Sequence, residues 1–183
     1  MHLRPPSSSV LLLCLALLVP GHAFADDVDD AARLFRAGQT AQALALADRV
    51  IAAKPGDAAM RFQKGVMLAD LGRTDEAIDV YDRLTQEYPA LPEPYNNLAV
   101  LLAARGDYEQ ARAALESAIR DNPGYAVAHE NLGDVHAALA AQAYARALQL
   151  DPSNASAPPK LALVRELLAR TRRGGSASAL PPS

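Results

Sequence analysis

The sequence predicts an all-α fold built from helix–turn–helix repeats, and three observations lead to this prediction. Small residues recur every 34 positions, at Ala31, Gly65, Ala99 and Gly133. Three more sets keep the same interval, and they begin at Gly38, Ala43 and Pro55. A fixed period of about 34 residues is typical of stacked helix pairs. Because one pair cannot bury its apolar faces alone, each pair is expected to pack against the next.

The first 25 residues are expected to form a cleaved secretory signal peptide, not part of the repeats. Arg4 gives a positive start, residues 10–19 form an apolar run, and Ala23-Phe24-Ala25 is a small-x-small cleavage site. The apolar run is shorter than the roughly 20 residues that a spanning helix needs. We therefore expect cleavage after Ala25 and no stable membrane insertion. The alternative is a short anchor that is not cleaved.

The charge of the predicted mature chain, residues 26–183, is close to balance. It has 17 basic residues (18 minus Arg4) and 21 acidic ones, which gives no indication of nucleic-acid binding. Basic residues dominate only between Lys160 and Arg173, where Glu166 is the single acid. The sole cysteine, Cys14, lies in the signal segment, so packing alone must hold the mature chain. Many arginines and alanines are typical of high-GC bacteria, and with the export signal they indicate the periplasm.

The three regular units are predicted to span residues 26–57, 58–91 and 92–125. In the second, the first helix runs over residues 58–71 and ends at Gly72, because glycine readily adopts the conformation that ends a helix. Thr74 is expected to cap the second helix, which continues to about Tyr88. The recurring proline then prevents its continuation.

Small and large side chains are expected to alternate where these helices pack. Gly65 and Ala43 are predicted to lie where two helices approach closely. Leu68, Leu102 and Tyr81 would fill the space around such contacts. Without this alternation each gap would cost about 1 kcal/mol or more.

The fourth unit, residues 126–152, begins in register at Gly133 but closes with Pro152, five residues early. No glycine or proline occurs between Asp134 and Leu150, and most residues there favour helices. Apolar residues continue at helical spacing: Ala128, Leu132, Val135, Leu139, Ala143, Ala147 and Leu150. We predict one long helix over residues 126–150. The alternative is a shortened repeat with a tight turn near residues 139–141.

A polar linker over residues 153–157 is predicted to lead into a basic helix that ends at residue 173. Pro158-Pro159 suits a helix start, and the expected apolar face is Leu161, Val164, Leu167 and Leu168. The basic residues have three interpretations: a solvated face of a capping helix, contact with anionic lipid, or docking onto the acidic remainder of the chain. Residues 174–183 are rich in Gly, Ser, Ala and Pro and are predicted to be disordered.

Residues 94–99 (Pro-Tyr-Asn-Asn-Leu-Ala), 106–111 (Gly-Asp-Tyr-Glu-Gln-Ala) and 121–123 (Asp-Asn-Pro) resemble tetratricopeptide repeats. The resemblance covers roughly Val28 to Pro152. It implies a right-handed superhelical array of antiparallel helix pairs, a TPR solenoid, with a C-terminal capping helix over its last repeat. It also implies a concave face lined by the first helix of each pair.

By this resemblance, the candidate partner-binding residues lie on the concave face. They are Val28, Phe35, Arg36, Phe62, Val66, Asp70, Glu93, Asn96, Val100, Glu130 and Asp134. An apolar floor edged by carboxylates suits an extended or helical peptide with some basic character. The alternative is that these are ordinary packing and solvated positions.

Capture of a peptide's terminal carboxylate, as in some relatives of this fold, is not expected. Asn97 matches an asparagine of that cluster, but Phe62, Val66, Val127 and Asn131 stand where basic residues would be needed.

The sequence contains no pattern that indicates catalysis, a cofactor or a metal. His129-Glu130 resembles the start of a zinc-protease helix, but Gly133 stands where the second histidine would be. We interpret His129 and His136 as substitutes for aromatic residues that these repeats carry.

We therefore predict a non-catalytic periplasmic scaffold or adaptor that binds a peptide or partner protein. One alternative is an accessory module of a cell-envelope enzyme system. Residues 128–151 resemble exported repeat proteins that carry a further domain linked to peptidoglycan modification. The other alternative is a periplasmic chaperone.

Overall fold

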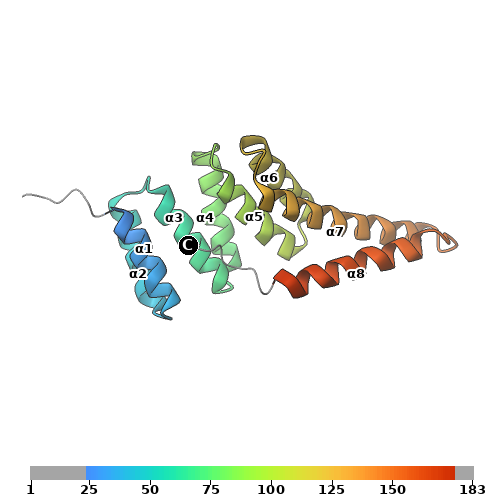
Figure 1. Cartoon of the computed structure of the whole chain (residues 1–183), viewed down its shortest axis with the longest axis horizontal. Helices are drawn as coiled ribbons and strands as arrows, with labels where there is room; N and C mark the ends of the chain where they lie inside the picture. The colour runs from blue at the N-terminus through green and yellow to red at the C-terminus, as the bar shows by residue number, and fades with distance from the viewer. Residues whose placement is uncertain (1–23, 176–183) are drawn as a thin grey trace, which may run out of the picture.

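The computed structural model describes residues 24–175, with side chains over residues 27–170. Within that range it has eight α-helices and no strand (Figure 1). Three antiparallel pairs come first: α1 (Phe24–Arg36) with α2 (Thr40–Ala53), α3 (Ala58–Asp70) with α4 (Thr74–Glu87), and α5 (Pro92–Arg105) with α6 (Tyr108–Asp121). Two longer helices follow, α7 (Ala126–Leu150) and α8 (Ala157–Gly175). Most of the predicted signal peptide and tail, residues 1–23 and 176–183, lies outside the described residues.

The turns inside the three pairs are made by the recurring glycines. Gly38, Gly72 and Gly106 have φ of 75°, 70° and 89°, a left-handed conformation that glycine adopts without steric cost. At the second turn the amide of Arg73 donates to the carbonyl of Leu68 (2.9 Å), which satisfies one of the last carbonyls of α3. The period of 34 thus reflects a repeated backbone requirement.

The predicted cap at the start of α4 is wrong. Thr74 is the first helical residue, so Arg73 occupies the capping position, and no side-chain hydrogen bond caps the helix there. The Arg73 guanidinium instead pairs with the Glu76 carboxylate at 2.7 Å, and Glu76 and Asp75 lie at the positive end of the helix dipole.

The predicted close approach at Gly65 is confirmed. A Cβ atom built there would lie 2.7 Å from two ring carbons of Tyr81, so no larger side chain fits between α3 and α4. Ala43, for which a close approach is also predicted, is fully buried. Leu68, Leu102 and Tyr81 are buried together in the larger core, as the sequence predicts. A second, smaller core joins α1, α2 and α3.

The fourth unit contains one continuous helix, as predicted: α7 runs for 25 residues without a turn. Its first half packs against α6 and α5, and α8 packs along it as the second arm of a hairpin. Figure 1 shows this hairpin projecting from the stack of shorter helices.

The apolar stripe predicted along all of α7 is interrupted. Its residues pack against the array as far as Leu139, but Ala143 is exposed and Leu150 is 70% exposed. The reason is geometric, because the array ends at α6 and the second half of α7 extends past it. Beyond that point α7 packs through a different face, which includes Tyr144 and Leu148.

The predicted apolar face of α8 is confirmed at Leu161, Val164 and Leu168 but is wrong at Leu167. Ala157 and Leu161 are buried and Val164 and Leu168 are half-buried, whereas Leu167 is 50% exposed. These four packed residues follow the i, i+4, i+7, i+11 spacing of a single helix face. The Asn154 side chain accepts hydrogen bonds from the amides of Ser156 (3.0 Å) and Ala157 (3.1 Å) where the helix begins. The helix extends to Gly175, two residues past the predicted end.

The face of α7 on which a second helix of the fourth repeat would pack is open to solvent. Ala99 and Gly65, one and two repeats earlier, are buried, but Gly133 is exposed and has nothing within 4 Å of a Cβ built there. His136 is also exposed, whereas its counterpart Leu102 is buried. Neither His136 nor His129 is buried, so neither side chain is enclosed in a core.

Candidate binding groove on the first helices

A groove of about 590 Å³ lies where α5, α6, α7 and α8 meet. Its lining is mostly aliphatic and is supplied by several helices, including Val100, Ala103 and Ala104 from α5, Asp134 and Ala138 from α7, and Leu168 from α8. The alanines line the floor of the groove with small side chains, and Val100 projects from this floor with 47% of its surface exposed. Because Val100 and Asp134 lie on first helices, this groove belongs to the face where the sequence predicts partner binding.

The charged group in the groove is the carboxyl of Asp134. Partial burial raises the pKa of Asp134 above its ordinary value, and the negative charge of Glu130, one turn earlier on α7, raises it further. Both effects disfavour the ionised carboxylate. A cation placed beside Asp134 would relieve this unfavourable electrostatic environment, so the groove favours a positively charged partner group.

A chain of polar side chains crosses the buried side of this groove. Asn131 donates through Nδ2 to Oδ1 of Asn96 (2.9 Å), and Asn96 donates to Oδ1 of Asn97 (3.3 Å). Asn97 in turn donates to the hydroxyl of Tyr81 (3.2 Å). The chain links α4, α5 and α7, and so fixes the positions of three successive repeats.

Tyr81 is the buried end of this chain. Burial raises the pKa of Tyr81 to about 12, although the hydrogen bond from Asn97 partly opposes the shift. Its ring also lies 5.6 Å from that of Phe62, centroid to centroid, at an interplanar angle of 56°. The side chain is therefore held from two sides, and it remains a neutral phenol at physiological pH.

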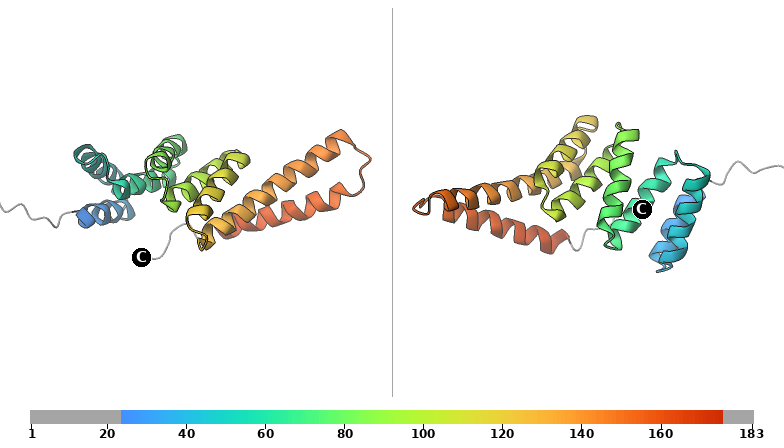
Figure 2. Two further views of the ribbon diagram at one scale, coloured as in Figure 1. Left: turned by 90° about the horizontal axis from the view of Figure 1, so that it is seen from above. Right: turned by 180° about the vertical axis from the view of Figure 1, so that it is seen from behind.

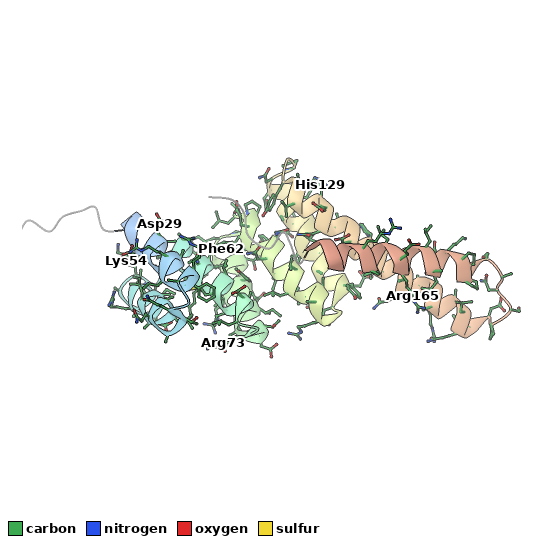
Figure 3. The ribbon with its side chains drawn as sticks, turned by 60° about the horizontal axis from the view of Figure 1, so that its bottom comes forward. Asp29, Lys54, Phe62, Arg73, His129 and Arg165 are labelled. Carbon is green, nitrogen blue, oxygen red and sulfur yellow. The ribbon has the colours of Figure 1, made fainter. Side chains whose placement is uncertain are left out.

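The structure brings together only part of the predicted concave set. Val100 and Asp134 line the groove, and Glu130 acts on it electrostatically. Arg36, Asp70 and Glu93 are exposed outside it, and Val66 is half-buried. The remaining four are engaged in packing: Val28 and Phe35 in the N-terminal core, Phe62 against Tyr81 (labelled Phe62 in Figure 3), and Asn96, 5% exposed, in the polar chain.

Two features of the site were not predicted. One is the polar chain, although Asn97 and Asn131 stand 34 positions apart and their recurrence was a usable signal. The other is the contribution of Leu168 from α8, for which the sequence carries no signal, because nothing in a helix's own pattern says on which side of its neighbour it lies.

Over the described residues, no group of three or more His, Cys, Asp or Glu side chains is placed to hold a metal ion. In the same part of the chain, no helix combines the length and the apolar character needed to span a bilayer.

Two family models match the repeat region of this chain. A model described as tetratricopeptide repeat matches residues 24–92, and one described as TPR repeat matches residues 101–139. The chain belongs to the tetratricopeptide-repeat family. The TPR fold supports a role as a scaffold for protein–protein interactions, and proteins of this family are generally non-catalytic.

Solved TPR structures show the same fold. A TPR protein of Thermus thermophilus, TTC0263, matches with a TM-score of 0.58 and 23% identity over 81% of this chain and 84% of its own. YrrB, described as a TPR protein with an unusual peptide-binding site, matches with a TM-score of 0.52 and 27% identity. That match covers 57% of this chain and 54% of YrrB.

A curated relative is similar to the repeats in sequence. The probable biofilm formation methyltransferase WspC of Pseudomonas aeruginosa is 35% identical to this TPR chain over 122 residues. The match covers 63% of this chain but only 29% of the relative, so the chain spans less than a third of that protein's length.

Proposed function

We propose that this TPR protein is a non-catalytic scaffold or adaptor of the periplasm and that it binds a segment of a partner protein in the groove between α5 and α7. The observation that carries the proposal is the pairing of an exposed valine, Val100, with a carboxyl in an unfavourable environment, Asp134, in one groove. The similarity to YrrB, whose description includes a peptide-binding site, supports a peptide segment as the ligand.

The apolar and acidic lining of the groove indicates which side chains a bound segment would carry. An apolar side chain would cover Val100 and the alanine floor, since exposed aliphatic surface gains about 25 cal/mol per Å² on burial. A Lys or Arg one turn away along the segment would lie beside Asp134, where a charge-assisted hydrogen bond is stronger than a neutral one. The expected ligand is thus a short apolar segment with a basic residue.

Photo-crosslinking in cells tests the proposal directly. A crosslinking amino acid placed at Ala104, exposed at the groove, should capture a partner, whereas the same probe at Ala113, exposed on α6, should not. Val100→Asp should abolish capture at Ala104 while changing the free energy of unfolding by less than about 0.5 kcal/mol, because the side chain is surface-exposed. Equal capture at Ala104 and Ala113, or none at either, would contradict groove binding.

The periplasmic part of the proposal has its own test. Osmotic-shock fractionation should recover the protein in the periplasmic fraction, shortened by the predicted 25 residues. Replacement of Leu12 and Leu13 by arginines should interrupt the apolar run of residues 10–19 and retain the full-length chain in the cytoplasm. Recovery of an unprocessed wild-type chain in the cytoplasm would contradict the proposed periplasmic location but not the proposed binding at the groove.

A second candidate function is that of an accessory module for an enzyme carried on another chain of the cell envelope. The observation in its favour is the similarity to part of a relative named as a methyltransferase. The identity of the crosslinked partner separates the candidates: one enzyme favours the accessory module, one non-enzymatic protein the adaptor, and many unrelated unfolded chains a chaperone.

A further inference from the structure

Two leucines of α8 lie outside its packed face. Leu163 is 69% exposed and Leu167 is 50% exposed, whereas Leu161 is buried and Leu168 is half-buried. Because α8 packs along α7 through the face of Leu161 and Leu168, the other two leucines point away from α7. They are four residues apart, so they lie one above the other on a single exposed side of the helix. The fold of the chain leaves this apolar pair uncovered.

Basic residues flank the pair on the same side of the helix. Lys160 lies three residues before Leu163, Arg170 lies three residues after Leu167, and both are exposed. Spacings of three, four and three residues keep all four side chains on one helical face. We call these four residues the leucine face of α8. Arg170 also pairs with Glu166 at 2.5 Å, but an exposed pair of this kind contributes little and leaves Arg170 able to pair with another acid.

The leucine face is carried by the projecting hairpin. Both views in Figure 2 show α7 and α8 extending together beyond the stacked pairs. Leu163 belongs to the first two turns of α8, next to the tip of the hairpin, so a second molecule can approach it without meeting the array. The groove of the same chain is out of its reach, because α8 contributes Leu168, from its packed face, to the groove lining.

The groove is complementary to the leucine face in both apolar surface and charge. It presents Val100 on an alanine floor beside the carboxyl of Asp134, with Glu130 one turn away on α7. The pKa of Asp134 is raised by burial and by Glu130, and among the described residues no basic side chain opposes this shift. The groove therefore offers apolar surface beside an acid that the array does not neutralise, and the leucine face offers apolar residues beside bases.

Charge is also divided unequally along the whole chain. Residues 157–175, which form α8, contain five basic residues and one acid, for a net charge of +4. Residues 26–156 contain 12 basic and 20 acidic residues, for a net charge of −8. Two copies with a hairpin against an array therefore attract each other, whereas two helices α8 side by side repel. Electrostatics favour a contact between unlike surfaces over a symmetric contact between two hairpins.

We propose that the partner in the groove is a second copy of this chain, which inserts the leucine face of its α8. This inference rests on the proposed function and names its partner. The two leucines cover Val100 and the alanine floor, and a basic residue of the same face lies beside Asp134. Because the two surfaces belong to different parts of the chain, each pair of copies still has one free groove and one free hairpin. Such a head-to-tail contact repeats, and it builds a ring if the rotation closes and a filament if it does not.

Two complementary variants test this contact. Val100→Asp damages the groove but keeps the leucine face, and Leu163→Asp does the reverse; both residues are exposed, so both variants should fold. In analytical ultracentrifugation, the purified wild type should form species larger than a dimer as its concentration rises. Each variant alone should associate at least about tenfold more weakly. Their equimolar mixture should form a dimer and stop there, because one intact groove meets one intact leucine face and no further pair remains.

The matched control is Ala162→Asp, which adds the same charge to α8 at an exposed residue about 100° around the helix from Leu163. It should associate like the wild type, and circular dichroism checks that every variant is folded. A monomeric wild type, a mixture that does not dimerise, or an Ala162→Asp as weak as Leu163→Asp would overturn the inference. Undiminished association of Val100→Asp alone would also overturn it and would indicate contact between hairpins. If the probe at Ala104 then still captures another protein, the proposed function stands without this inference.

Discussion

At the scale of single residues, Gly65 and Gly133 occupy the same position in two repeats but have opposite surroundings. Gly65 lies against the ring of Tyr81, which Phe62 and Asn97 hold in place. Gly133 faces open solvent within a continuous helix. The same substitution at both positions should therefore change stability in opposite directions.

Gly65→Ala should lower the free energy of unfolding by about 1–3 kcal/mol, the usual range for overpacking a close contact. Gly133→Ala should raise it by about 0.5–1 kcal/mol, because alanine loses less conformational freedom than glycine in a helix. Urea unfolding followed by circular dichroism measures both. A destabilising Gly133→Ala would show that a side chain or partner covers that face.

The raised pKa of Asp134 makes stability depend on pH in a defined direction. The Asp134 carboxyl contributes its full stabilisation below the pKa of an aspartate in the unfolded chain. This contribution is lost as the pH rises through the higher pKa of Asp134 in the folded state. Asp134→Asn should therefore be more stable than the wild type at pH 7, and the difference should vanish near pH 3, where the carboxyl is protonated in both states. Melting temperatures at the two pH values test this. A less stable variant at pH 7 would mean that Asp134 has a favourable charged partner.

At the scale of the element, α7 shows what a helical pattern does and does not predict. The absence of glycine and proline between Asp134 and Leu150 was enough to predict one helix. The face that packs could not be predicted along its whole length, because Ala143 and Leu150 continue the stripe past the end of α6. Local sequence determines that a helix forms, whereas its neighbours determine which of its faces is buried.

The helix α8 offers a matched pair of leucines for a test of its docking. Leu161→Ala should destabilise the hairpin by about 2 kcal/mol or more, since this side chain is only 7% exposed. Leu163→Ala should change stability by less than about 0.5 kcal/mol. Because a repeat array can open locally, the readout is hydrogen exchange of residues 157–170. Similar effects of the two substitutions would mean that α8 rotates about its axis.

At the scale of the whole molecule, the repeat period predicts the array, and the structure adds the projecting hairpin (Figure 1). Val100 and Asp134 could be placed at the groove from the sequence, because first-helix positions recur with the repeat period. Phe62 and Asn96 were misplaced because the concave position alone does not distinguish an open side chain from one packed against Tyr81 or Asn131.

The elongated shape can be measured in solution. A compact domain of this size would have a radius of gyration of about 15 Å. Small-angle X-ray scattering of the mature chain should give a clearly larger value, because the hairpin extends beyond the stacked pairs. A value near 15 Å would show that the hairpin folds back onto the array.

The exposed face around Gly133 has a consequence for how such a chain can lengthen. In the regular units, a new pair packs on the second helix of the pair before it, as α5 packs on α4. After α7 the next helix is α8, which packs along α7 into the projecting hairpin, and the surface around Gly133 stays exposed. Duplication of a unit at this end would have no surface on which to stack. Growth of the array by gene duplication is therefore confined to positions before α7, and the hairpin acts as a terminator of the repeat series.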